Sequence, residues 1–235
     1  MDLTIAELTE RFPDFRVAVL VAEGLTVSPD GPESLDRDIL AREAACRASH
    51  AGLDLSAIPG VAAWRSAYKG FGIKKTSYRS SVERLIKRVL AGDALPRING
   101  FVDIYNAVSL AHGFCIGADD IDRIAPPVAF RFSRPGDTFL DMGAEATDDP
   151  NDPPKEGEVV LADTRHVLCR RWNWRQDMRS AITVETKRAL ITIQANGWGD
   201  LDAAVSDLAE LLDRHCGARV KIGHADARTS AVTLA

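Results

Sequence analysis

The sequence lacks the motifs of several large enzyme classes. It contains no Walker loop, no GxGxxG, no GxSxG and no HExxH, and no activated serine or cysteine stands beside a plausible base, so covalent catalysis is unsupported. The four cysteines and five histidines are scattered, with no CxxC, HxH or HxxxH pair. Because a zinc site needs clustered ligands, we expect reduced, mostly buried thiols and no bound metal.

Long apolar segments are also missing. No run approaches the about 20 apolar residues that a membrane-spanning helix needs. The N-terminus, MDLTIAELTERF, carries acids where a signal peptide requires Lys or Arg. We therefore expect a cytoplasmic protein with no membrane partner. With 46% hydrophobic and 27% charged residues, the 235-residue chain is typical of a globular protein with a substantial core.

The net charge of -5 argues against strong, nonspecific nucleic-acid binding, but the charge is unevenly distributed. Between Arg65 and Arg97, nine residues are basic and two are acidic, with aromatic residues interleaved. This basic strip is the best candidate for a surface that follows a phosphate backbone; the alternative is a solvated helix face. Its candidate binding residues are Lys69, Lys74, Lys75, Arg79, Arg84, Lys87 and Arg88.

Hydrophobic periodicity predicts a single α/β (α+β) domain over residues 1–235, with helices first and strands later. Ser80 and Glu83 stand in capping-box register before an apolar stripe that ends at Gly92, and Asp200 is placed to cap a helix to Cys216. Further helices are expected over about 35–50 and 61–72 and before Gly113. Strands are expected over 16–25, 158–162, 167–171, 188–195, 218–222 and 229–234, with more strands around a turn in 131–143.

The helix before Gly113 carries a row of polar side chains within an otherwise apolar sequence. At about 100° per residue, this polar row falls within roughly 120° of arc. Val102 and Leu110 lie inside the same arc, so it is not an ordinary solvated face. Either the row forms the wall of a cleft, or it is an internal hydrogen-bond network in which Asp103 binds Arg97. The polar row consists of Asn99, Asp103, Asn106 and Ser109, and the opposite side of Ile104, Tyr105, Ala107, Val108 and Ala111.

Two other segments carry unusual chemistry. Residues 169–179, CRRWNWRQDMR, place four arginines and two tryptophans directly after a predicted strand. This favours either recognition of phosphate, carboxylate or nucleobase, or a hairpin end whose Trp residues cover the core. Asp119, Asp120 and Asp122 form a DDxD cluster, for which a cap made by Asp120 or Asp122 is a better interpretation than a divalent ion.

The run NGFVDIYNAVSLAHGFCIGADDIDRI resembles the B3/B4 module of the bacterial phenylalanyl-tRNA synthetase β chain. That module has the pattern N/P-x-V-D-x-x-N-x-V-x-L-x-x-G-x-P, then A-x-D-x-D. The segments EVVLADTRHVLCRR and ITVETKRALI are similar to later parts of the module. The sequence resembles the free-standing members of the family more closely than it resembles the synthetase module. The resemblance covers roughly residues 60–195. The residues that fit the pattern are Val102, Asp103, Asn106, Val108, Leu110, Gly113, Asp120 and Asp122.

In the synthetase, this module hydrolyses the ester that joins a wrong amino acid to its tRNA. The resemblance therefore implies a three-layer fold with a mixed β-sheet core and flanking helices, and no metal or organic cofactor. It implies a deacylase that acts in trans on aminoacylated tRNA and has no DNA partner. The acceptor stem of the tRNA would then follow the basic strip. The implied catalytic residues are Asp103, Asn106 and Asp177, and the implied substrate-binding residues are Asn99, Ser109, Arg170, Arg171, Asn173 and Trp174.

The chain departs from the family pattern at one functional turn. The synthetase module has Gly-Gly-Glu before its V-T-x-E-T segment, whereas this chain has WRQDMRSA, in which the nearest acid, Asp177, is about one position out of register. The amino-acid specificity of the family is therefore not carried over. Two other classes stay open: a hydrolase of small amino-acid esters or amides, and a non-catalytic module that binds tRNA or an amino acid.

Overall fold

The strands of the protein form two sheets. In the computed structural model, which describes residues 1–73, 78–144 and 149–234, sheet A has the order β10-β1-β4-β5-β6-β7 and sheet B the order β3-β8-β2-β9. Sheet A is mixed because β1 pairs with β4 in parallel, whereas every pair in sheet B is antiparallel. The strands are β1 (Asp2–Thr4), β2 (Phe15–Glu23), β3 (Cys115–Asp120), β4 (Val128–Phe132), β5 (Val159–Ala162), β6 (Val167–Arg170), β7 (Arg175–Gln176), β8 (Arg188–Asn196), β9 (Arg219–Ala225) and β10 (Ala231–Thr233).

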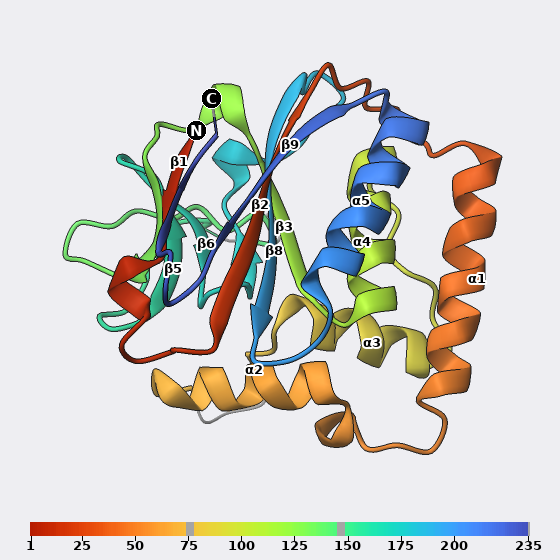
Figure 1. Ribbon diagram of the computed structural model, residues 1–235, viewed down its shortest axis with the longest axis horizontal. Helices are drawn as coiled ribbons and strands as arrows, with labels where there is room; N and C mark the ends of the chain where they lie inside the picture. Colours follow the sequence, from red (N-terminus) through yellow and green to blue (C-terminus); the bar gives the residue numbers. More distant parts are fainter. Residues whose placement is uncertain (74–77, 145–148, 235) are drawn as a thin grey trace.

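The sheets and helices are stacked in layers. Sheet B lies between sheet A on one side and helices α4 and α5 on the other, with α1 outside them (Figure 1). Helices α2 and α3 lie across one end of this stack (Figure 1). This confirms the expected α+β class. The helices are α1 (Glu33–Ser49), α2 (Pro59–Gly70), α3 (Ser81–Leu90), α4 (Gly100–His112) and α5 (Leu201–Cys216).

The centre of sheet B follows directly from the sequence. β2 is largely apolar and β8 has an apolar segment, both strands are buried over almost their whole length, and they pair in one register from Phe15↔Asn196 to Glu23↔Arg188. Strands that are buried on both faces have such continuous apolar runs instead of alternating ones. These two strands therefore form the middle of the core, and β3 and β9 form the edges of the sheet.

The starts of α3 and α5 and the end of α4 are where the sequence predicted them. The Ser80 hydroxyl accepts a hydrogen bond from the Glu83 N–H (3.4 Å), and the Asp200 carboxylate accepts one from the Ala203 N–H (3.0 Å). Gly113 ends α4 in the left-handed conformation that glycine favours. No helix of the described residues combines the length and the apolar character that crossing a membrane requires.

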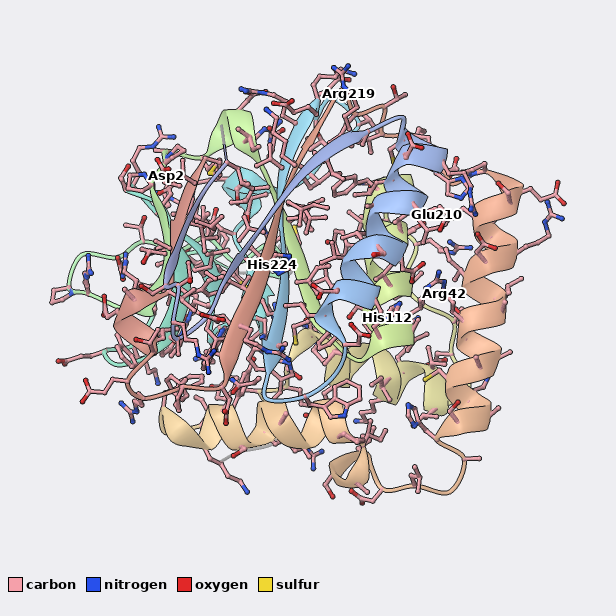
Figure 2. The ribbon with its side chains drawn as sticks, in the orientation of Figure 1. Asp2, Arg42, His112, Glu210, Arg219 and His224 are labelled. Atoms are coloured by element: carbon pink, nitrogen blue, oxygen red, sulfur yellow. The ribbon has the colours of Figure 1, made fainter. Side chains whose placement is uncertain are left out.

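A charged cluster ties the three helices of the outer layers together. Arg42 of α1 donates two hydrogen bonds to the Asp207 carboxylate of α5, at 2.6 and 2.7 Å, and His112 of α4 lies 2.7 Å from the same carboxylate. Arg42 and His112 both lie between the helices in Figure 2. These contacts fix α4, and with it the residues that α4 contributes to the groove described below.

The structure differs from the sequence-based expectation in three respects. The Asp-rich segment after Gly113 is strand β3, which pairs with β8 over six residue pairs. The strands form two sheets instead of one, and residues 138–142 contribute only isolated bridges. Asp120 has the expected capping role, because its carboxylate accepts the Asp122 N–H (3.0 Å). The same carboxylate also accepts the Thr186 hydroxyl (2.7 Å), which allows this acid to be buried.

Candidate functional site

A groove runs between α3, α4 and the β6–β7 hairpin, above strand β3. It consists of an outer cavity of about 630 Å³ and an inner pocket of about 320 Å³. The two adjoin each other, because the same six residues line both. We call the two parts the outer cavity and the inner pocket. The shared residues are Ser81, Arg84, Tyr105, Asn106, Met142 and Gln176.

One face of sheet B forms the floor of the inner pocket. Gly117 and Asp119 of β3 point to the same side because side chains two residues apart share a face. The antiparallel register pairs Gly117 with Thr192 of β8, and Gln194 follows on the same face. All four residues line the inner pocket. The floor is therefore polar, although it belongs to a buried sheet.

Asp119 is the acid on this floor. Its side chain is 3% exposed, and Oδ1 accepts hydrogen bonds from the Ser180 hydroxyl (2.7 Å) and from Gln176 Nε2 (2.5 Å). Among the described residues, no donor reaches Oδ2. Burial, helped by the negative charges of Asp177 and Asp163, raises the pKa of Asp119 to about 7, although the two hydrogen bonds act in the opposite direction. A carboxyl group with this pKa exchanges a proton near neutral pH.

A chain of hydrogen-bonded amides and hydroxyls runs from Tyr68 through Asn173 to the floor of the inner pocket. The Tyr68 hydroxyl donates to Asn173 Oδ1 (2.9 Å), Asn173 Nδ2 donates to Gln194 Oε1 (3.1 Å), and Gln194 Nε2 donates to Thr192 Oγ1 (3.0 Å). Each amide has a second N–H, and the Thr192 hydroxyl has its own hydrogen to donate. The pocket therefore offers fixed donors close to a carboxylate acceptor.

Helix α4 contributes Tyr105 and Asn106 to both parts of the groove. Asn106 is the one member of the predicted polar row that lines the groove, and its side chain makes no hydrogen bond to other described residues. Tyr105 was expected on the core side of the helix, but it lines the groove beside Asn106. Burial raises the pKa of Tyr105, so that its hydroxyl stays protonated near neutral pH.

The rest of the polar row is an internal hydrogen-bond network. Asn99 caps α4 by accepting the Val102 N–H (3.0 Å). Asp103 accepts the Ile98 N–H (2.9 Å) and lies 3.4 Å from Arg97 Nη1, and the Ser109 hydroxyl donates to the Phe114 carbonyl (2.6 Å). These side chains hold the start and end of α4 in place and do not reach the groove. The alternative interpretation of the row thus applies to three of its four residues.

Residues of the 169–179 segment separate into two groups. Asn173 and Trp174 line the inner pocket. Arg170 is fully buried and donates to the Glu158 carboxylate at 2.8 and 2.9 Å. Asp177 is fully buried and accepts the Leu140 N–H (2.8 Å) and three hydrogen bonds from Arg179, one from its backbone N–H and two from its guanidinium. Arg170 and Asp177 therefore stabilise the hairpin and do not face the groove, contrary to the roles that the resemblance implied.

Arg171 is held between two aromatic rings. Its guanidinium carbon lies 3.9 Å from the ring centre of Tyr78 and 4.4 Å from that of Trp174, and Nη2 lies 3.3 Å from Glu158. The backbone at Arg171 and Trp172 is left-handed, with φ of 44° and 67°. Such a conformation is rare for residues with large side chains. It turns the chain so that Trp172 enters the core while Asn173 and Trp174 reach the pocket.

Cations line the outer cavity. Arg84, Lys87 and Arg88 lie on the exposed face of α3 and line this cavity, and Arg79 lies just before that helix. Arg84 donates to the Trp174 carbonyl (3.1 Å), and Arg79 pairs with Glu83 (3.0 Å). Of the other predicted cations, Lys69 is exposed on α2 and outside the groove lining, and Lys74 and Lys75 lie outside the described residues.

The floor of the inner pocket was not predicted from the sequence. Gly117, Asp119, Gln176, Thr192 and Gln194 were not predicted as site residues. The available signal was the alternation of Thr192 and Gln194 within the apolar segment 188–195, because polar residues two apart in a buried strand require partners on one face. Over the described residues, no three His, Cys, Asp or Glu side chains converge in a way that could hold a metal ion.

These observations define a layered α+β domain with a polar pocket between its helices and a hairpin. A family model of the B3/4 domain matches residues 63–197. The chain therefore belongs to the B3/4 domain family. The matched region includes all residues of the floor of the inner pocket.

No curated protein matches the chain. Among solved structures, the chain is similar to an N-terminal fragment of the phenylalanyl-tRNA synthetase β-subunit from Pyrococcus horikoshii. The two are 15% identical with a TM-score of 0.46, and the match covers 93% of this chain. The chain spans 50% of the length of that structure.

Proposed function

We propose that the groove is the catalytic site of a deacylase that hydrolyses the ester of mischarged aminoacyl-tRNA in trans. The observation that carries the proposal is Asp119, a buried carboxyl group with a pKa of about 7 on the floor of a pocket whose outer rim is basic. The similarity of the 99–124 segment to a synthetase editing module supports the same reaction.

The two parts of the groove suit two parts of such a substrate. Lys87 and Arg88 at the rim offer positive charge to the phosphates near the end of the acceptor strand. The walls of the outer cavity include Val102, Met142 and Ile182, an apolar surface that suits the terminal nucleoside. The inner pocket then receives the aminoacyl group.

The proposed reaction needs a base and donors but no covalent nucleophile, because an aminoacyl ester is already activated. Ionised Asp119 takes a proton from a water molecule, and the water oxygen adds to the ester carbonyl carbon. The Asn106 amide and the Thr192 hydroxyl donate to the developing oxyanion. When the intermediate collapses, the bond to the ribose oxygen breaks and that oxygen takes the proton from Asp119. One water is consumed, and an amino acid and a free tRNA are released.

A panel of mischarged tRNAs tests the hypothesis that the protein is a deacylase. We expect the wild-type protein to release the amino acid from at least one of them, and Asp119→Asn to abolish release while the protein stays folded. The rate should fall as the pH is lowered through about 7, since the base must be ionised. A wild-type protein that binds these tRNAs but releases no amino acid above the buffer rate would instead be a binding module.

Charge reversal distinguishes a tRNA substrate from a small ester. We expect Lys87→Glu with Arg88→Glu to reduce activity on aminoacyl-tRNA and leave activity on an amino-acid methyl ester unchanged. The matched control is Arg219→Glu, an exposed residue at the start of β9, which lies at the opposite end of the molecule from α3 (Figure 2). Equal activity of all variants on tRNA would favour a small-molecule hydrolase. Binding to tRNA should also weaken steeply with salt.

A further inference from the structure

Gly117 is the feature of the inner pocket that the fold does not explain. It lies inside strand β3, where glycine weakens the strand compared with a residue that has a side chain. Ten glycines of the described residues have positive φ, which accounts for their identity, but Gly117 is not one of them. The backbone conformation therefore does not require glycine at this position.

Close packing does not require it either. A Cβ atom added to Gly117 would meet no atom nearer than Gln176 Oε1, at the ordinary van der Waals distance of 3.9 Å. The contrast with other glycines is large: at Gly60 the same atom would stand 2.5 Å from the Gly113 carbonyl oxygen, and at Gly223 it would stand 2.3 Å from a methyl group of Val232. The volume that a side chain would fill at Gly117 belongs to the inner pocket.

The position of this open volume relates it to the acyl group of the substrate. Gly117 and Asp119 lie on one face of β3, two residues and so about 7 Å apart. The volume over Gly117 is therefore within reach of the side chain of an aminoacyl group whose carbonyl is held at Asp119. Around that path lie Leu161, Cys169 and Asn173, which line the same pocket. A glycyl or alanyl group would leave this volume empty, whereas a longer side chain would fill it.

We propose that Gly117 is the specificity determinant of the groove, and that it selects aminoacyl groups whose side chains extend past the β-carbon. The proposal rests on the deacylase function proposed above and adds the class of substrate to it. It assigns to one residue the size limit of the pocket, because any side chain at position 117 would occupy the space that the substrate side chain needs.

The test is a size series at position 117 assayed against a size series of substrates. Wild type, Gly117→Ala and Gly117→Val are compared on tRNAs that carry alanine, leucine or methionine. Leu161 and Cys169 give this part of the lining an apolar character, and a single methylene against an apolar wall changes kcat/KM by about tenfold or more. We therefore expect Gly117→Val to lose at least about tenfold on the leucyl and methionyl esters while the alanyl ester changes by less than about threefold. Gly117→Ala should lie between wild type and Gly117→Val.

Two controls separate pocket filling from damage to the fold. Ala231→Val adds two methyl groups at an exposed strand position of sheet A and should leave every rate unchanged. Thermal unfolding of each variant shows whether it is folded. If Gly117→Val does not fold, the comparison is made with Gly117→Ala. A loss by the same factor on all three esters, or no loss on any, would overturn the role of Gly117 and leave the deacylase function intact.

A binding measurement separates failure of this proposal from failure of the proposed function. The probes are the non-hydrolysable alanyl and leucyl amides of 3′-amino-3′-deoxyadenosine. If the wild type hydrolyses no ester, the deacylase function is refuted. Gly117 then still determines size if Gly117→Val weakens binding of the leucyl amide alone. Equal binding of both amides by both proteins would refute the size limit as well.

Discussion

Replacing Asp119 by asparagine should stabilise the protein at neutral pH while it abolishes deacylation. The carboxyl group is buried on the pocket floor, where its charged form is poorly solvated, and its pKa rises from the ordinary 3.8 to about 7. Asparagine has nearly the same shape and keeps an oxygen that accepts from Ser180 and Gln176. The substitution thus removes the charge and preserves the packing.

The size of the expected gain in the free energy of unfolding follows from the raised pKa of Asp119. Below about pH 4, both the folded and the unfolded protein hold the proton, and Asp119 contributes no pH dependence. Between about pH 4 and pH 7, the unfolded state releases the proton and the folded state keeps it, so the free energy of unfolding falls as the pH rises. The rise of the pKa to about 7 corresponds to a total of about 4 kcal/mol, since each pH unit is worth about 1.4 kcal/mol.

Urea unfolding of wild type and Asp119→Asn at several pH values between 4 and 8 measures this difference directly. We expect the free energy of unfolding of the variant, relative to that of the wild type, to rise by up to about 4 kcal/mol from the low to the high end of that range. Asp213→Asn, which removes an exposed carboxylate of α5, is the control and should show no such trend. A pH-independent difference between wild type and Asp119→Asn would mean that Asp119 ionises like an exposed acid, which would remove the basis for its role as the base.

Three further outcomes follow from the contacts. Asn106→Ala should leave the free energy of unfolding unchanged, because no described residue forms a hydrogen bond with the Asn106 side chain. It should lower kcat by about 100-fold, because an oxyanion donor is lost. If stability and rate are both unchanged, Asn106 is not part of the site. Gly117→Ala should raise the free energy of unfolding by about 0.5–1 kcal/mol, measured by urea unfolding, because its φ is ordinary and its Cβ meets open space. Glu158→Ala should destabilise the protein by about 3–5 kcal/mol in the same assay, because it leaves the fully buried Arg170 without its main partner; a loss below about 1 kcal/mol would contradict this.

Local patterns in the sequence were sufficient for most helices and for the core strands. The capping residues Ser80 and Asp200 and the stop at Gly113 act over a few residues, so their effect can be read without knowledge of the fold. The apolar segments of β2 and β8 likewise indicated a buried sheet. The motifs around Asn106 were also specific enough to predict the B3/B4 relationship, which the family match confirms.

The polar row on α4 shows the limit of periodicity. The angular positions of Asn99, Asp103 and Ser109 were consistent with either a cleft wall or internal contacts. The choice depended on partners that the helix itself does not specify, such as the Phe114 carbonyl for Ser109 and Arg97 for Asp103. The same ambiguity placed Tyr105 on the wrong side, because the groove lies next to the boundary between the two faces.

The floor of the pocket was decided by tertiary structure alone. Asp119 becomes a functional candidate because β3 pairs with β8 and because Gln176 and Ser180, about 60 residues further along the chain, cover one of its oxygens. Strand register depends on distant partners, and a shift by one residue would turn Asp119 and Gly117 away from the pocket. The sequence by itself determined most of the helices and core strands, the family and the basic face of α3. Which acid is buried, which side chains meet it and where the empty volume lies follow only from the packing of segments far apart in the chain.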